Sequence, residues 1–149
     1  MIICDTREKK NAHIIRYFDR AGIAYEIKKL DTGDYMSTRS ETLTIDRKQN
    51  LAEICGNLFS ADKSRFWREV RRSKAERIKM IVLIEEGGAF KTLKDVPRWR
   101  GRYTKITGYQ LYNEMCRCSI AYGVEFLFCD KRSTGRMITE LLGETDGKR

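Results

Sequence analysis

The chain has 149 residues, of which 41% are hydrophobic and 34% charged, so it is long enough to bury the core of one globular domain. Lys and Arg outnumber Asp and Glu by 30 to 21, and the net charge of +9 favours a polyanionic partner. The sequence lacks a long apolar run, a signal-peptide pattern, a P-loop and a dinucleotide fingerprint, so we expect a cytoplasmic or nuclear protein without a membrane span or nucleotide cofactor.

The first third of the chain alternates strands and a helix. Residues 1–5 are a short apolar run that ends in a carboxylate, which predicts a buried strand. Residues 11–22 place apolar side chains at helical spacing before a glycine, and residues 23–30 alternate like a strand. Residues 34–37 and 42–48 are predicted to be the two arms of a hairpin.

The middle of the chain contains two predicted helices and the most hydrophobic strand. Residues 50–59 form an amphipathic pattern, and residues 62–77 predict a very basic helix. Residues 79–85 predict a buried strand, and residues 87–105 a long, basic connection with poor periodicity. The next helix is predicted at residues 107–122, ending at a glycine.

A strand at residues 124–129 and a helix at 133–142 complete the pattern. Alternating strands and helices indicate an α/β domain, with a mixed central sheet flanked by helices. We expect a single domain over residues 1–142 and a flexible C-terminal tail at 143–149.

Most of the excess positive charge lies in residues 61–110, which carry 14 basic and 6 acidic side chains. A localised basic surface is typical of proteins that contact a phosphate backbone. One basic stripe is predicted on helix 62–77, beside Phe66 and Trp67. A second basic group alternates with Trp99 and Tyr103, which suits stacking on unpaired bases. The predicted DNA-contacting residues in these two groups are Arg65, Arg68, Arg72, Arg98, Arg100, Arg102 and Lys105. The alternatives are a solvated helix face and a disordered, solubilising loop.

The cysteines and the single histidine give little indication of a metal site or of acid–base catalysis. The five cysteines have no paired zinc-type spacing, so we expect reduced, mostly buried thiols. His13 is the only histidine, and we expect a structural role away from every motif.

Asp46 and Lys48 are the most informative pair. Two residues apart on a strand, they should project from one face while Arg47 projects from the other. Asp34, on the other hairpin arm, should converge with them. Two carboxylates can hold Mg²⁺ or Mn²⁺, which activates water and neutralises phosphate charge, and a lysine can stabilise the transition state. Taken singly, Asp34 could be a turn residue, and Asp46 and Lys48 a solvated strand face.

The segments C4-D5-T6-R7-E8, G33-D34-Y35 and I45-D46-R47-K48 resemble, in this order, the D-x-R-E, G-D-Y and E-R-K elements of the XPF-type family of structure-specific endonucleases. Similarity continues through L51-A-E-I-C-G-N-L-F59, R65-F-W-R-E-V-R71, M80-I-V-L-I-E85, T107-G-Y-Q-L-Y112 and Y122-G-V-E-F126. The resemblance implies a restriction-endonuclease-like (PD-(D/E)xK) fold.

By the same resemblance, Asp5, Glu8, Asp34 and Asp46 would line the metal site, with Lys48 as the catalytic lysine. Arg7 and Arg47 would support the site or contact DNA, and Gly33 would permit the turn before Asp34. From the residues alone, Asp5 and Glu8 could instead be a helix-capping pair. The sequence departs from the family where Asp46 replaces the glutamate of E-R-K.

The resemblance implies a metal-dependent endodeoxyribonuclease that cuts branched, flap or fork DNA in repair, recombination or replication, as a homodimer or heterodimer. The helix at 107–122 and the terminal helix are the expected dimer surfaces. A helix–hairpin–helix module, frequent in the family, does not follow Leu142, which leaves open whether a partner supplies DNA binding. Two alternatives are a catalytically silent DNA-binding or docking module of the same fold, and a Holliday-junction or restriction-type nuclease.

Overall fold

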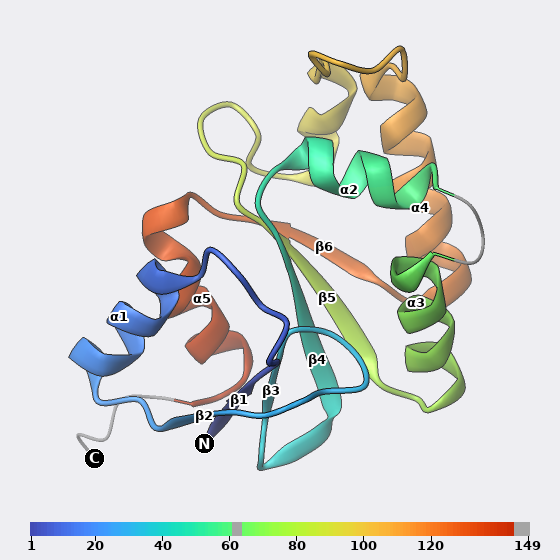
Figure 1. The fold of residues 1–149 in the computed structure, drawn as a ribbon. Coiled ribbons are helices and arrows are strands. Elements are labelled where there is room, and N and C mark those ends of the chain that lie inside the picture. Colours follow the sequence, from blue (N-terminus) through green and yellow to red (C-terminus); the bar gives the residue numbers. More distant parts are fainter. Residues whose placement is uncertain (61–63, 145–149) are drawn as a thin grey trace.

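Six strands form one mixed sheet at the centre of the protein, in the order β2-β1-β3-β4-β5-β6 (Figure 1). This computed structural model describes residues 1–60 and 64–144. The strands are β1 (Ile2–Cys4), β2 (Tyr25–Ile27), β3 (Tyr35–Ser37), β4 (Ser40–Lys48), β5 (Lys79–Ile84) and β6 (Glu125–Phe128). β3 runs antiparallel to both β1 and β4, whereas β4, β5 and β6 are parallel to one another.

This pairing brings distant parts of the sequence to one edge of the sheet. The C-terminal ends of β1 and β4 lie on either side of the N-terminal end of β3, because β3 runs in the opposite direction. Two backbone hydrogen bonds of 2.8 Å extend the ladder there, from Asp5 N to the Asp34 carbonyl and from Asp34 N to the Ile45 carbonyl. The residues that follow β1 and precede β3 therefore meet the end of β4.

Helices cover both faces of the sheet (Figure 1). One face carries α1 (Ala12–Ala21) and α5 (Thr134–Leu141), and the other carries α2 (Leu51–Leu58), α3 (Arg65–Ala75) and α4 (Gly108–Tyr122). The expected α/β class and flanked mixed sheet are confirmed. Among the described residues, none of the helices is long and apolar enough to cross a bilayer.

The two layers of helices create two hydrophobic clusters, and β5 contributes to both. Met80, Val82 and Ile84 pack toward α2, α3 and α4, whereas Ile81 and Leu83 pack toward α1 and α5. This alternation follows from the two-residue period of a strand. All five side chains are buried, and each contributes roughly 1.5–3 kcal/mol relative to an exposed position. All cysteines are free, and Cys4, Cys55 and Cys118 are buried.

The connection at 87–105 is more ordered than its weak periodicity predicts. It contains the 3-10 helix η1 (Leu93–Arg98), which begins with a capping box between Thr92 and Asp95. Val96 and Trp99 are buried in the core on the α2–α4 face, and Arg100 forms an isolated bridge with Thr107. The disordered-loop alternative is therefore wrong, because apolar anchors hold the basic segment to the domain.

The predicted tail at 143–149 also needs correction at its start. Glu144 is buried and binds Ser37 and Arg39 through its carboxylate, at 2.5 and 2.9 Å, and it pairs with the amino group of Met1 at 2.8 Å. Polar partners at the β3–β4 turn thus hold Glu144 in place, although the sequence predicted a flexible tail there. Residues 145–149, like residues 62 and 63 of the predicted basic helix, lie outside the described residues.

Candidate active site

A cleft of about 380 Å³ opens at the edge of the sheet where β1, β3 and β4 meet. Charged side chains dominate its lining, and helices α2 and α3 close one side. The acidic and basic residues that line it include Arg7, Glu8, Asp34, Asp46, Lys48, Glu53, Arg65 and Glu69. The topology of the sheet thus collects most of the predicted site residues in one cavity.

Asp46 and Lys48 project from the same side of β4. Lys48 Nζ lies 3.0 Å from Asp46 Oδ2, and the two side chains are 11% and 7% exposed. The contact is an ion pair without hydrogen-bonding geometry, because Asp46 Oδ2 is a buried oxygen that no donor in the described chain hydrogen-bonds. Burial lowers the pKa of Lys48, but the carboxylates of Asp46 and Asp34 outweigh it and raise this pKa overall. Lys48 is therefore a fixed ammonium ion at neutral pH.

Asp34 reaches the same cavity from the start of β3. Gly33 precedes it with a φ of +77°, a left-handed conformation that glycine adopts without strain. Asp34 Oδ2 accepts a hydrogen bond of 2.8 Å from the backbone N–H of Arg47. Burial, together with repulsion from Asp46 and Glu8, raises the pKa of Asp34 well above its usual range. Crowded carboxylates of this kind are stabilised by a cation.

Asp5 and Glu8, both expected to bind metal, are already engaged by other groups. Asp5 accepts hydrogen bonds of 2.8 Å from Arg7 Nε and from the backbone N–H of Leu30, and it does not line the cleft. Glu8 lines the cleft, but it forms two hydrogen bonds with the Arg47 guanidinium, at 2.8 and 3.0 Å, and accepts one from Tyr35 at 2.5 Å.

The four expected carboxylates are therefore not grouped around one point in this structure, and the assignment of Asp5 and Glu8 as metal ligands stays a prediction. Among residues 1–60 and 64–144, no group of three or more His, Cys, Asp or Glu side chains is arranged to hold a metal ion. The reason is local: the guanidinium groups of Arg7 and Arg47 occupy the oxygens of Asp5 and Glu8. Asp34 and Asp46 remain as the acidic pair beside Lys48.

Glu69, which no motif in the sequence indicated, projects from α3 into the cleft. Its side chain is 10% exposed, and its Oε1 is buried without a hydrogen bond among the described residues. The pKa of Glu69 is raised overall, because burial and the charge of Asp46 outweigh the lowering effect of Arg65 and Arg7. The available signal was that Glu69 is the one acidic residue of the basic stretch Arg65–Ala75, flanked by arginines on both sides.

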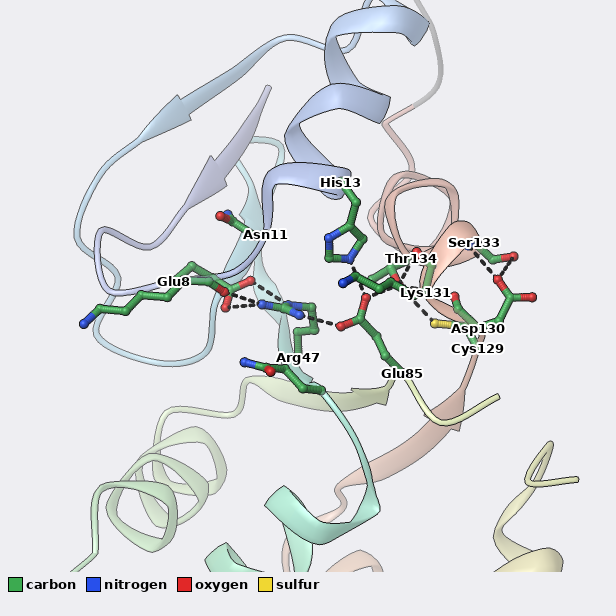
Figure 2. A network of polar contacts seen from close by, with 12 residues as sticks. Glu8, Asn11, His13, Arg47, Glu85, Cys129, Asp130, Lys131, Ser133 and Thr134 are labelled. Carbon is green, nitrogen blue, oxygen red and sulfur yellow. Dashed lines mark hydrogen bonds and ion pairs between the residues drawn. The ribbon is translucent and has the colours of Figure 1, made fainter. Parts of the chain in front are cut away.

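Arg47 points to the opposite side of β4 from Asp46 and Lys48, as its position between them predicts. There it forms the buried network that Figure 2 shows, between Glu8 and Glu85. Glu85, directly after β5, also contacts His13 Nε2 at 2.6 Å and accepts a hydrogen bond of 2.5 Å from Thr134. This network joins β4, β5, α1 and the start of α5.

This network bears on the expectations for Arg47 and His13. The Arg47 side chain is only 2% exposed and pairs with two carboxylates, which fits support of the site, one of the two roles that the resemblance implied, better than DNA contact. His13 is not remote from the motifs, because Glu85 links it to Arg47 (Figure 2). The missed partner was Glu85, an acid at the end of the most hydrophobic strand, where a buried charge requires pairing.

The predicted DNA-contacting residues fall into two regions. Arg7 and Arg65 line the cleft, with side chains 39% and 46% exposed. Arg68 and Arg72 lie exposed on α3, where Arg72 also hydrogen-bonds the carbonyl oxygen of Asp31. Phe66 is not a stacking surface beside them, because it is buried beneath the Lys48 ammonium, 5.1 Å from its ring centroid.

The second region is the segment after η1. Arg100, Arg102 and Lys105 are exposed, whereas Arg98 pairs with Asp95 at 2.8 Å. Trp99 is only 7% exposed and packs in the core, so it cannot stack on a base as its sequence context suggested. Tyr103, at 93% exposed, remains available for that role.

Comparison with known proteins agrees with this architecture. Residues 4–141 match the ERCC4 domain. Two solved structures are similar, XPF from Aeropyrum pernix alone and in complex with DNA, each with 23% sequence identity and a TM-score of 0.69. The match covers 95% of this chain but 62% of each XPF chain, so the protein spans less than two thirds of those relatives. A search of curated proteins gave no match.

Proposed function

The chain belongs to the ERCC4-domain family, a family of nucleases, and on that premise we propose that it is a metal-dependent DNA endonuclease. The observation that carries the proposal is the Asp46–Lys48 pair on one face of β4, with Asp34 beside it in the same cleft. Phosphodiester hydrolysis uses such a combination, in which oxygen ligands bind a hard cation and a fixed positive charge faces the reacting phosphate.

Nucleases of this family generally depend on a divalent metal, and the donor set here fits Mg²⁺ or Mn²⁺. Asp46 Oδ2 is a buried carboxylate oxygen that contacts the Lys48 ammonium at 3.0 Å but accepts no hydrogen bond of good geometry in the described chain, so its coordination capacity is not filled. Mg²⁺ is often held by one or two carboxylates together with water and phosphate oxygens. Asp34 and Asp46 would hold the ion, which when bound lowers the pKa of a water molecule and neutralises phosphate charge.

The other cleft residues have supporting roles in this proposal. Lys48 is held as an ammonium ion in a nearly dry environment, where its charge stabilises negative charge that develops on the phosphate. Arg7 and Arg65 lie at the cleft and bind the neighbouring backbone phosphates. Glu8 and Glu85 fix Arg47, which donates its backbone N–H to Asp34 and so orients that carboxylate.

For the substrate, we propose branched, flap or fork DNA, met in repair, recombination or replication. Membership of the family and the similarity to an XPF solved with DNA support this choice. A dimer formed through α4 and α5, with a homologous or different partner, belongs to the same proposal.

The test is cleavage of labelled flap, fork, four-way-junction and plain duplex DNA, with Mg²⁺, with Mn²⁺ and with chelator. Asp34→Asn keeps the size of the side chain but removes its charge, and Glu41→Gln makes the same change at an exposed site outside the cleft. We expect metal-dependent cutting of flap or fork DNA that Asp34→Asn abolishes and Glu41→Gln preserves.

Binding of branched DNA without cutting in either metal would instead identify a silent DNA-binding module of the same fold. Preferred cutting of the four-way junction would identify a junction-type nuclease. Cutting that persists in the Asp34→Asn variant would show that the cleft is not the active site.

A further inference from the structure

The exposed aromatic side chains of the described residues gather around one segment. They are Phe59, Tyr103 and Tyr109, which are 41%, 93% and 67% exposed. Phe59 and Tyr103 line a groove between α2 and residues 99–106, and Tyr109 lines a second groove on the other side of that segment. Exposure of aromatic rings to water is unfavourable, and exposed apolar patches commonly mark binding sites. Three such rings around one segment therefore indicate a ligand with a flat apolar surface.

The groove between α2 and residues 99–106 is apolar and has a volume of about 470 Å³. This volume lies within the usual range for small-molecule sites. We call it the aromatic groove; its walls and floor include Ala52, Gly56, Phe59, Trp99, Tyr103 and Ile106. Small residues on α2 keep it open, since a Cβ added at Gly56 would meet nothing within 4 Å.

The segment that forms one wall of the aromatic groove is positively charged: Arg102 lines this groove, and Arg100 and Lys105 line the second groove on the other side of the segment. Residues 98–105 contain Arg98, Arg100, Arg102 and Lys105 but no acidic residue. Within residues 1–60 and 64–144, no carboxylate forms an ion pair with Arg100, Arg102 or Lys105, and Arg102 lies 6.0 Å from the ring centroid of Tyr103. Rings beside unpaired cations match the two parts of a nucleotide, its base and its phosphate.

The aromatic groove also lies next to the catalytic cleft, because α2 forms a wall of both. Glu53 and Asn57, four residues apart, face the cleft, whereas Ala52, Gly56 and Phe59 face the aromatic groove. The two cavities are therefore separated by about the diameter of one helix, roughly 10 Å. A strand that leaves the cleft could reach the groove within a few nucleotides.

We propose that the aromatic groove binds an unpaired nucleotide of single-stranded DNA. The base enters the groove and stacks on Tyr103 and Phe59, and the phosphate beside it faces Arg102. The strand then continues toward Arg100 and Lys105 on the other side of the segment. This inference rests on the proposed nuclease function, because it assigns the groove to the unpaired strand of a flap or fork. Plain duplex cannot use the site, since its bases remain stacked inside the helix.

The test is fluorescence anisotropy in chelator, with a labelled single-stranded oligonucleotide and a duplex of the same length. We compare wild type with Tyr103→Ala, Tyr103→Phe and Ile27→Ala; Ile27, also highly exposed, lies on the edge strand β2 and serves as the control. Tyr103→Ala should weaken single-strand binding by roughly 5- to 150-fold, as expected for loss of one stacked base, while Tyr103→Phe and Ile27→Ala bind like wild type. Duplex binding should be unchanged.

Equal weakening of single-strand and duplex binding by Tyr103→Ala would overturn the proposal, as would no weakening at all. Self-association that Tyr103→Ala abolishes, measured by sedimentation, would assign the groove to a second copy of the chain and also overturn it. The cleavage assay with Asp34→Asn is independent of this measurement. If the protein cuts DNA but Tyr103→Ala leaves its affinity for single strands unchanged, only the proposal for the aromatic groove is refuted. If single-strand binding depends on Tyr103 but no DNA is cut, only the nuclease proposal is refuted.

Discussion

Arg47 Nη1 donates a hydrogen bond of 2.5 Å to Glu85 Oε1 across the ends of the parallel strands β4 and β5. Both side chains are 2% exposed, so water cannot replace either partner. Burial opposes the charge of Arg47, but Glu8 and Glu85 raise its pKa overall. The pair therefore fixes a charged residue beside the catalytic cleft, at a place where an unpaired charge would be costly.

Glu85→Ala should destabilise the protein strongly. Removing Glu85 leaves Arg47 paired with Glu8 and takes away the hydrogen-bond acceptor of Thr134, so we expect a loss of about 3 kcal/mol in the free energy of unfolding, the lower end for a broken buried pair. Urea unfolding at neutral pH measures the change. Glu125→Ala is the control, because the Glu125–Lys79 pair joins side chains that are 47% and 49% exposed and should contribute at most about 1 kcal/mol. Similar losses in the two variants would contradict a structural role for the buried network.

Lys48→Met should reduce cleavage while preserving DNA binding. Methionine keeps much of the side-chain volume over the Phe66 ring but removes the ammonium. Loss of one preorganised electrostatic group typically lowers the rate about 10²- to 10³-fold. Single-turnover cleavage measures the chemical step, and anisotropy in chelator measures binding. Lys79→Met, which removes an exposed lysine on β5, should cut at the wild-type rate. Equal loss of binding and cleavage in Lys48→Met would indicate a role in DNA contact instead.

The sequence predicted the strands that carry this site and the positions of its central residues. Periodicity located the strands, and the spacing of Asp46 and Lys48 placed them on one face, because a two-residue period is a local property of the backbone. The position of Asp34 beside them followed from the hairpin. The resemblance to XPF-type nucleases supplied the order of the motifs, and the ERCC4 match confirmed it.

What could not be predicted was the pairing of charges across the fold. Asp5 and Glu8 carry the same carboxylate as Asp46, and nothing in their spacing indicates that Arg7 and Arg47 engage them. Those contacts depend on side-chain directions and on strands far apart in the sequence. The same limit applies to Trp99, whose basic neighbours suggested exposure, although it is buried in the hydrophobic cluster on the α2–α4 face.

Glu144 should make stability depend on pH in the acid range. Arg39, the amino group of Met1 and Ser37 lower its pKa to about 2 from a usual value of 4.5, against an opposing effect of burial. A depressed pKa in the folded state means that the contribution is fully present above pH 4.5 and is lost as pH falls toward 2. The free energy of unfolding of wild type minus that of Glu144→Gln should therefore shrink over this window. A constant difference from pH 6 to pH 2 would exclude this ion pair as the cause.

Gly33→Ala should disturb both the fold and Asp34. Gly33 has a φ of +77°, and a Cβ built there would lie 2.1 Å from Thr44 Oγ1, which is buried and bonded to the Thr32 carbonyl. Gly22 is the matched control, because its φ is +71° but an added Cβ would meet nothing within 4 Å. Each alanine should lose about 1–2 kcal/mol of stability because its backbone is left-handed. Only Gly33→Ala also introduces the overlap between the new Cβ and Thr44.

Thermal unfolding should accordingly show a larger loss of stability for Gly33→Ala than for Gly22→Ala. Cleavage measured well below the melting temperature should fall only in Gly33→Ala, because relief of the overlap with Thr44 moves the start of β3 and, with it, the carboxylate of Asp34. If both variants lose equal stability and both cut normally, the close approach of Gly33 to Thr44 does not position the acidic pair, and Asp34 must be held by the Arg47 backbone N–H alone.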